Sequence, residues 1–237
     1  MDNFVDFVAN HVIMNITTIR ESAARFGGQC SWHFSQCKDP VRTIIGKAGK
    51  TDNGICEILS AKWVALTVSG LGTLQGWLSN GGAGKRKDLD VARISILAQA
   101  FGSGYDDQEN TTEAWLKAQN VSQLNQTDMG GGIGHGASKV DIDDLLGDMS
   151  GRVGRLGNPV TGLISIAEDN YWLKYKGHAM AIRLHSGATP PVMYFDPNYG
   201  EFTFPNYNSF KDWFTFYYRE SHYQKFLGTY YKVRYFN

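Results

Sequence analysis

Three side chains of the types that enzymes use for nucleophilic catalysis stand at meaningful places in this sequence. Cys56 follows the polar turn Asp52-Asn53-Gly54 and begins a segment with helical apolar spacing. His178 lies near the start of one expected strand, and Asp196 ends the next. A cysteine nucleophile needs a thiolate, a base that forms it and a group that holds the base in place. We therefore take Cys56, His178 and Asp196 as candidates for these three roles.

The position of Cys56 favours a reactive thiol. Gly54 permits a tight turn, which places Cys56 in the first turn of the following helix. Backbone N–H groups without partners and the helix dipole favour negative charge at such a place. A cysteine near a helix start can equally be buried and inert. The prediction therefore depends on whether a base comes near it.

The strands that carry the other two residues are consecutive in the sequence. His178–Leu184 and Val192–Asp196 have the composition of strands, and the turn residues between them allow an antiparallel hairpin. The start of one strand and the end of the next then lie at the same end of the sheet. A carboxylate at Asp196 can accept a hydrogen bond from the imidazole and fix its tautomer, while the other ring nitrogen faces the Cys56 helix. Taken alone, a strand histidine is more often structural, and Asp196-Pro197-Asn198 is also a good turn signal.

Acyl chemistry at Cys56 also needs donors for an oxyanion. The Cys56 backbone N–H is one expected donor, and a side-chain amide is the expected second. Asn53 is the best local candidate, although it is also suited to cap the helix. Gln29 and Gln36 are alternatives if the preceding segment folds over the site.

Other arrangements of reactive residues are weaker. Cys30, His33 and Cys37 offer three potential zinc ligands, but a closed zinc site needs four and no partner pair appears. His135 is a rival base with no neighbour to orient its ring. The Gly-rich stretch 129–136 around it lacks the GK[ST] of a phosphate-binding loop, so we expect a mobile loop of unknown role rather than a nucleotide site. The sequence thus predicts no metal and no cofactor.

Composition limits the classes of function. The chain has 237 residues, a formal net charge of zero and three cysteines. No basic patch favours nucleic acid, and three cysteines are too few for a disulfide framework. The first 26 residues lack the basic and apolar regions of a Sec signal peptide, and no run of about 18 apolar residues predicts a membrane span.

The order of expected elements predicts an α+β fold in one domain over residues 1–237. Helical periodicity dominates the first half, and period-two strands dominate from residue 163 onward, which favours helices packed on an antiparallel sheet. We treat residues 1–50 as a helical N-terminal extension of uncertain role, with irregular structure over 29–50. The expected helices are 4–26, 55–68, 89–101, a short helix capped by Asn110, 141–149 and 210–219. The expected strands are 163–167, 178–184, 192–196, 201–204 and 230–236.

Three blocks of the sequence resemble the YopT/AvrPphB family of cysteine peptidases, which are papain-like effectors delivered by bacterial secretion systems. The blocks occur in the family's order: Gly54-Ile55-Cys56-x-x-Leu59-Ser60-x-x-Trp63, Gly177-His178-Ala179-Met180-Ala181 and Phe195-Asp196-Pro197-Asn198-Tyr199-Gly200-Glu201-Phe202. The resemblance implies a papain-like fold with a central antiparallel sheet. It also implies Cys56 as nucleophile, His178 as general base and then acid, and Asp196 as orienter.

The expected function is therefore that of a secreted bacterial effector or toxin that cleaves a protein in the cytoplasm of a target cell. Its partner is a protein substrate, with a cognate chaperone or an immunity protein as a further possibility, and its export uses a specialised secretion system. Glutamine deamidation or acyl transfer by the same three residues is an alternative, because the triad does not distinguish these reactions. A binding module with an idle site is a second alternative.

Overall fold

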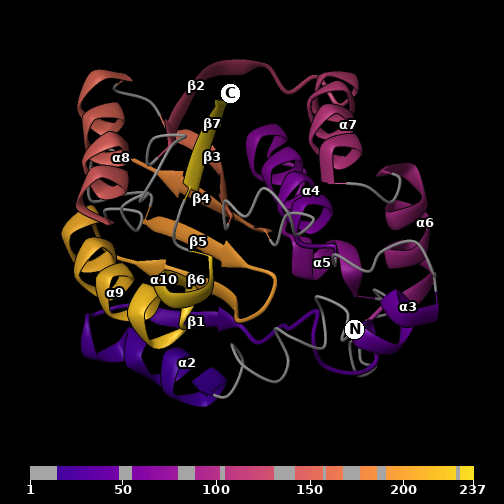
Figure 1. Ribbon diagram of the computed structural model, residues 1–237, viewed down its shortest axis with the longest axis horizontal. Coiled ribbons are helices and arrows are strands. Elements are labelled where there is room, and N and C mark those ends of the chain that lie inside the picture. The colour runs from indigo at the N-terminus through magenta and orange to yellow at the C-terminus, as the bar shows by residue number, and fades with distance from the viewer. Residues whose placement is uncertain are drawn as a thin grey trace.

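The computed structural model describes residues 15–47, 55–79, 89–101, 105–130, 142–156, 159–167, 177–185, 191–227 and 230–237. Within these ranges the chain forms a central antiparallel sheet covered by helices on both faces, as Figure 1 shows. The predicted α+β class with helices on a central antiparallel sheet is thus confirmed.

Seven strands form the sheet in the order β1-β6-β5-β4-β3-β7-β2. The strands are β1 Gln29–Trp32, β2 Gln123–Gly130, β3 Val160–Ala167, β4 Gly177–Leu184, β5 Val192–Asp196, β6 Gly200–Phe204 and β7 Tyr230–Phe236. The sheet brings together segments from both ends of the sequence, since β1 pairs with β6 and β2 pairs with β7.

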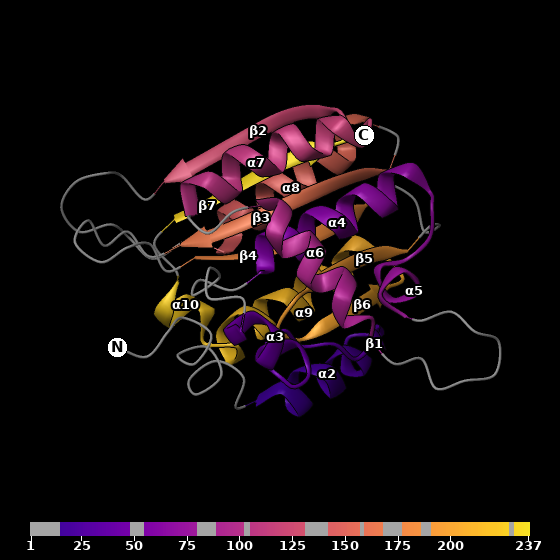
Figure 2. The ribbon, with the colours of Figure 1, turned by 90° about the vertical axis from the view of Figure 1, so that its right-hand side faces the viewer.

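Helices between residues 41 and 118 cover one face of the sheet, whereas the helix at residues 16–25 lies with the helices from residue 142 onward on the other side (Figures 1 and 2). The helix α4 (Cys56–Ser69) packs on β3 and β4. On the other side, α8 (Ile142–Leu156) contacts β3 and α9 (Tyr207–Glu220) contacts β6. The remaining helices are α2 Ile16–Arg25, α3 Val41–Lys47, α5 Leu74–Leu78, α6 Val91–Phe101, α7 Tyr105–Ala118 and α10 Tyr223–Phe226.

The helix α4 is buried on almost all sides. Its apolar residues include Ile58, Leu59, Trp63 and Leu66, each at most 7% exposed, and Ser60 is buried as well. The sequence predicted a single apolar face, and this was wrong because α5, α6 and α7 cover the side that faces away from the sheet. A helix buried all round is held in place from several directions. The residue at its first position is therefore firmly placed.

The strands of the second half follow the prediction closely. The bounds of β5 and β7 are those expected, and β3, β4 and β6 each begin one to three residues earlier. The pairs Ala181↔Phe195 and Arg183↔Met193 confirm that β4 and β5 are antiparallel neighbours. The end of β5 therefore lies beside the start of β4, as the hairpin argument requires.

Three local predictions were wrong. The Gly-rich stretch 129–136 was expected to be a loop, but its first two residues belong to β2, because β7 supplies hydrogen-bonding partners along that strand. The segment 29–50 was expected to be irregular but contains β1 and α3. Asn110 was expected to cap a helix but lies inside α7, while the cap of α9 is Asn206, which accepts from the Ser209 N–H. The rest of the Gly-rich stretch and the first part of the predicted helix 4–26 lie outside the described residues.

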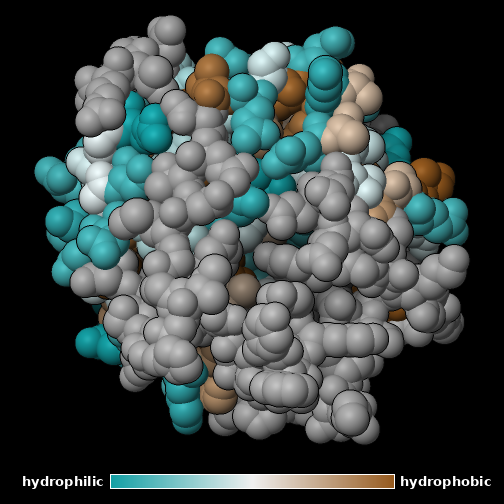
Figure 3. Space-filling model, turned by 45° about the horizontal axis from the view of Figure 1, so that its top comes forward, coloured by the Kyte–Doolittle hydropathy of each residue, from teal (hydrophilic) through white to brown (hydrophobic). Residues whose placement is uncertain are grey.

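Hydrophobic side chains are scattered over the surface. In the coloured part of Figure 3 they form small separate patches between hydrophilic residues. Among the described residues, the large apolar side chains that are exposed are Leu71, Ile96 and Leu124. None of the helices in these ranges is long and apolar enough to cross a bilayer.

Candidate active site

Cys56 is the first residue of α4 and is 6% exposed. The Ile55 carbonyl just before it accepts the Leu59 N–H at 2.9 Å, which is the first hydrogen bond of the helix. The Cys56 N–H therefore stands among the backbone donors that have no partner within a helix. This position suits both a thiolate and an oxyanion donor.

His178 and Asp196 form a buried pair at the end of the sheet. The Nε2 atom of His178 lies 2.9 Å from Oδ1 of Asp196, and both side chains are 0% exposed. Since a carboxylate only accepts hydrogen bonds, Nε2 carries the proton in the neutral imidazole. Its Nδ1 atom is then left with a lone pair that can take a proton. The structure thus brings these two predicted residues together in the expected arrangement.

Cys56 acts on the same imidazole. Burial lowers the pKa of His178, but the charge of Asp196, its hydrogen bond and then Cys56 raise it, to about 10. The buried Nδ1 atom makes no hydrogen bond of good geometry within the described part of the chain. Cys56 thus lies close enough to raise the pKa of this ring. A negative charge at Cys56 favours the protonated form of His178, and a protonated His178 in turn favours the thiolate form of Cys56.

The Asp196 carboxylate accepts four hydrogen bonds. Oδ1 accepts from His178 and from the Asn198 N–H at 2.6 Å, and Oδ2 accepts from the hydroxyls of Tyr217 and of Tyr223, the latter at 3.1 Å. Burying a carboxylate is costly unless its oxygens are hydrogen-bonded. These donors keep the anion in place without a cationic partner other than His178 among the described residues.

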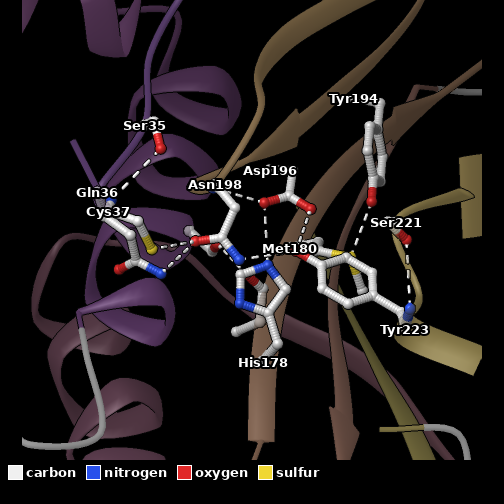
Figure 4. Close-up of polar contacts among 12 residues, drawn as sticks. Ser35, Gln36, Cys37, His178, Met180, Tyr194, Asp196, Asn198, Ser221 and Tyr223 are labelled. Atoms are coloured by element: carbon white, nitrogen blue, oxygen red, sulfur yellow. Dashed lines mark hydrogen bonds and ion pairs between the residues drawn. The ribbon is translucent and has the colours of Figure 1, made fainter. Parts of the chain in front are cut away.

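Tyr223 also covers the imidazole. Its ring centre lies 5.0 Å from that of His178, with the planes tilted by 36°. Its hydroxyl accepts from Nδ2 of Asn198 at 2.7 Å, and Figure 4 shows His178 between these two side chains. Burial and Asp196 raise the pKa of Tyr223, so its hydroxyl stays a donor. The ring excludes water from one side of the His178–Asp196 pair.

The remaining predicted site residues have different outcomes. Asn53 and His135 lie outside the described residues. Gln29 is exposed on β1, whereas Gln36 is buried and hydrogen-bonded to Asn198. A group of three or more residues able to hold a metal is absent from the described ranges. Cys30 donates to the Trp32 carbonyl and Cys37 to Asn198, so the two thiols have separate partners.

The sequence did not single out the residues that surround Asp196. Tyr217 and Tyr223 belong to a C-terminal segment rich in aromatic residues, a composition that is typical of core packing. Asn198 was recognised only as a turn residue. The signal that could have identified it is the Asn198 amide within Asp-Pro-Asn, because a buried amide needs partners.

A separate pocket of about 320 Å³ opens between α7 and the end of the sheet, lined by Glu113, Lys117, Val121 and Phe236 among others. It shares no residue with the site at Cys56. None of its side chains is a nucleophile paired with a base, so it does not compete for the chemistry.

Comparison with known proteins identifies the family of this chain. The family model described as Yersinia/Haemophilus virulence surface antigen, Peptidase_C58, matches residues 20–233. The chain belongs to this family. It is a cysteine peptidase of the YopT/AvrPphB type, as the three sequence blocks implied.

Two relatives of this C58 peptidase are named as cysteine proteases. The protein adenylyltransferase and cysteine protease IbpA of Histophilus somni (strain 2336) is 29% identical over 210 residues, which are 84% of this chain and 5% of IbpA. The cysteine protease YopT of Yersinia pestis is 28% identical over 209 residues, which are 84% of this chain and 61% of YopT. The chain therefore spans less than two thirds of the length of either protein.

The solved structure of the Pseudomonas avirulence protein AvrPphB shares the fold. It superposes with a TM-score of 0.50 at 17% identity and covers 77% of this chain and 91% of AvrPphB. The likeness extends the papain-like expectation from the sequence to the arrangement of helices and sheet.

Proposed function

We propose that this chain is a bacterial effector peptidase that cleaves a protein of a target cell with Cys56, His178 and Asp196. The observation that carries the proposal is the buried 2.9 Å contact between His178 Nε2 and Asp196 Oδ1, with Cys56 at the adjoining helix start. The named relatives support it, since YopT and IbpA are both called cysteine proteases.

The reaction follows from the roles of the three residues. The Cys56 thiolate attacks the carbonyl carbon of an amide, and the Cys56 N–H helps to hold the oxyanion. The imidazolium of His178 gives its proton to the leaving amine. The same ring then takes a proton from water, which releases the acyl group from sulfur. Asp196 keeps the ring in the tautomer and orientation that both steps need.

The proposed place of action is the cytoplasm of the target cell after export by a specialised secretion system. The family description as a virulence surface antigen supports a role outside the producing cell. A protein substrate is the partner that this chemistry requires, and a chaperone or immunity protein in the producing cell belongs to the same proposal.

Substitution of the nucleophile tests the proposal directly. Cells that produce the wild-type chain should contain new protein N-termini that are absent from cells producing Cys56→Ala, whereas Cys30→Ala should behave as wild type. The measurement is proteomic identification of N-termini. The proposal fails if the wild-type chain and Cys56→Ala give the same N-termini.

Mass spectrometry of a treated target separates cleavage from the alternative reactions. A cut chain supports peptidase activity. An uncut chain with a shift of about one dalton per site, as amide hydrolysis at a side chain produces, would replace it with glutamine deamidation.

A further inference from the structure

Gln36 connects the two halves of the candidate site. It lies in the segment after β1 and is 1% exposed. Its side-chain Nε2 donates to Oδ1 of Asn198 at 2.9 Å, and its Oε1 accepts the Ile55 N–H at 3.1 Å. Its own backbone N–H donates to the Pro197 carbonyl at 2.7 Å. One residue thus holds both the turn after β5 and the entry to α4, as the left side of Figure 4 shows in part.

The Asn198 end of this bridge leads to the base. Asn198 gives its backbone N–H to Asp196 Oδ1 and its Nδ2 to the Tyr223 hydroxyl, which donates to Asp196 Oδ2. Rotation of the Asn198 side chain would break its bond to Tyr223. Because Gln36 donates to the only oxygen of that amide, it fixes which way the amide points.

The Ile55 end leads to the nucleophile. Ile55 immediately precedes Cys56 and is 1% exposed, so its N–H has no water to bond with. Gln36 satisfies this donor and thereby fixes the chain as it enters α4. The path from Asp196 to Cys56 therefore runs through hydrogen bonds between buried groups, of which only Asp196 is charged.

An oxyanion donor has to aim a free N–H at the place where the oxygen develops charge. The sequence left Gln36 open as such a donor. In the structure one N–H of its amide donates to Asn198, its amide oxygen accepts from Ile55, and the side chain is buried. Cys37 shares the same acceptor, with its Sγ 3.3 Å from Asn198 Oδ1. Gln36 is therefore placed to connect two parts of the protein rather than to contact a substrate.

We propose that Gln36 is a positioning residue that sets the distance between Cys56 and the His178–Asp196 pair. The assignment rests on the proposed function, because it takes Cys56 as the nucleophile and His178 as its base. Displacements of about 1 Å between reacting groups can lower a rate by about a hundredfold. Gln36 therefore contributes to the rate without touching the reacting atoms.

Alkylation of Cys56 by iodoacetamide separates this role from that of an oxyanion donor. Alkylation displaces iodide at a saturated carbon and forms no oxyanion, so it reports only on the thiol and its base. Gln36→Met should slow alkylation of Cys56 by about tenfold or more and move the midpoint of its pH profile to higher pH. Gln29→Met, which changes an exposed glutamine on β1, should leave rate and midpoint unchanged.

A double-variant cycle tests the bridge itself. Asn198→Ala and Gln36→Met act on one path, so the double variant should lose little more rate than the more severe single variant. The measurement is peptide mapping of the alkylated protein over time, with circular dichroism to show that each variant is folded. If Gln36→Met does not fold, Gln36→Glu keeps the acceptor for Ile55 and removes the donor to Asn198; its alkylation rate is then compared at a pH above the midpoint, because the added carboxylate shifts the midpoint by itself.

Two results would overturn the inference, and they differ from failure of the proposed function. An unchanged alkylation profile in a folded Gln36 variant, or fully additive losses in the cycle, would remove the positioning role. If instead wild-type Cys56 reacts no faster than Cys30 and Cys37, the assignment of the nucleophile fails and the positioning role fails with it.

Discussion

At the scale of single residues, the site depends on hydroxyl donors that hold a buried carboxylate. Tyr217 and Tyr223 both donate to Oδ2 of Asp196, and the Tyr194 hydroxyl donates to that of Tyr217 at 3.0 Å. Burial, and next the charge of Asp196, raise the pKa of all three tyrosines. The donors are therefore neutral hydroxyls throughout the pH range in which proteins are stable.

Removing these hydroxyls should destabilise the fold. Tyr217→Phe and Tyr223→Phe each take one donor from the buried anion, so we expect the free energy of unfolding to fall by about 1–3 kcal/mol in each case. Urea denaturation followed by fluorescence measures it.

Tyr218 provides a matched control in the same helix. Its hydroxyl is buried and makes no hydrogen bond to any described residue. Tyr218→Phe should therefore change the free energy of unfolding by no more than about 0.5 kcal/mol. Equal losses at Tyr217 and Tyr218 would show that the contact with Asp196 contributes nothing.

The raised pKa of His178 predicts how stability depends on pH. The folded-state pKa is about 10 and the unfolded value is 6.5, so the folded protein binds the proton more tightly. The resulting stabilisation is fully present below about pH 6.5, decreases as the pH rises and is lost above about pH 10.

The measurement compares Cys56→Ser with Cys56→Ser/His178→Gln, because the serine background removes titration of the thiol. The difference in unfolding free energy between the two should be largest at about pH 6 and should shrink as the pH rises, and it should vanish below pH 10 because Cys56 no longer helps to raise the pKa of His178. A difference that is constant over this range contradicts a protonated His178 in the fold.

Of the site predicted from the sequence, the pairing of His178 with Asp196 is the part that the structure contains. The predicted hairpin places the histidine and the aspartate at one end of the sheet, where they can hardly avoid contact. In the structure His178 does contact Asp196. The sequence offered Gln36 only as an oxyanion donor and assigned no role to Tyr217 and Tyr223, because the partners of these residues are distant along the chain. Gln36 and Asn198, for example, are separated by 162 positions, and no local pattern encodes such a contact.

At the scale of elements, the turn between β5 and β6 depends on Gly200. This residue has a φ of +116°, and a Cβ added to it would clash with the Trp32 carbonyl oxygen. The close approach places β1 against β6 at the edge of the sheet. The glycine of the Asp-Pro-Asn-Tyr-Gly block is thus required both by the turn and by the neighbouring strand.

Gly200→Ala should lower the free energy of unfolding by about 2–4 kcal/mol, because it adds both backbone strain and a steric clash. Gly70 is the control, since it also has a positive φ, of +66°, but a Cβ added there would meet no atom within 4 Å. Gly70→Ala should cost about 1 kcal/mol. Thermal or urea denaturation of both variants makes the comparison, and similar losses would mean that packing against Trp32 is unimportant.

Helices and strands were predictable where the sequence has a strong apolar periodicity. They were not predictable where a segment becomes a strand only by pairing with a distant strand. The strands β5 and β7 have alternating and aromatic residues and were placed correctly. The strand β2 has the sequence QLNQTDMG, which is polar and ends in glycine, and it is a strand only because β7 lies beside it. Tertiary pairing overrides local preference in such segments.

At the scale of the whole molecule, the fold joins two sets of elements that are separate in the sequence. The helices α4 to α7 come from the first half, and most strands come from the second. The candidate site lies where α4 meets β4 and the turn after β5. The order of helices and strands predicted this arrangement, whereas the contribution of β1 and β2 to the sheet depended on partners that the order alone does not give.

The place of β7 has a consequence for the timing of activity. This strand is the last along the chain, yet it lies inside the sheet between β3 and β2. During synthesis on the ribosome, β2 emerges about a hundred residues before its partner, and such distant pairings form slowly. Translation therefore has to pass residue 236 before the sheet can close. We therefore expect no peptidase activity from this chain before residue 236 has been synthesised.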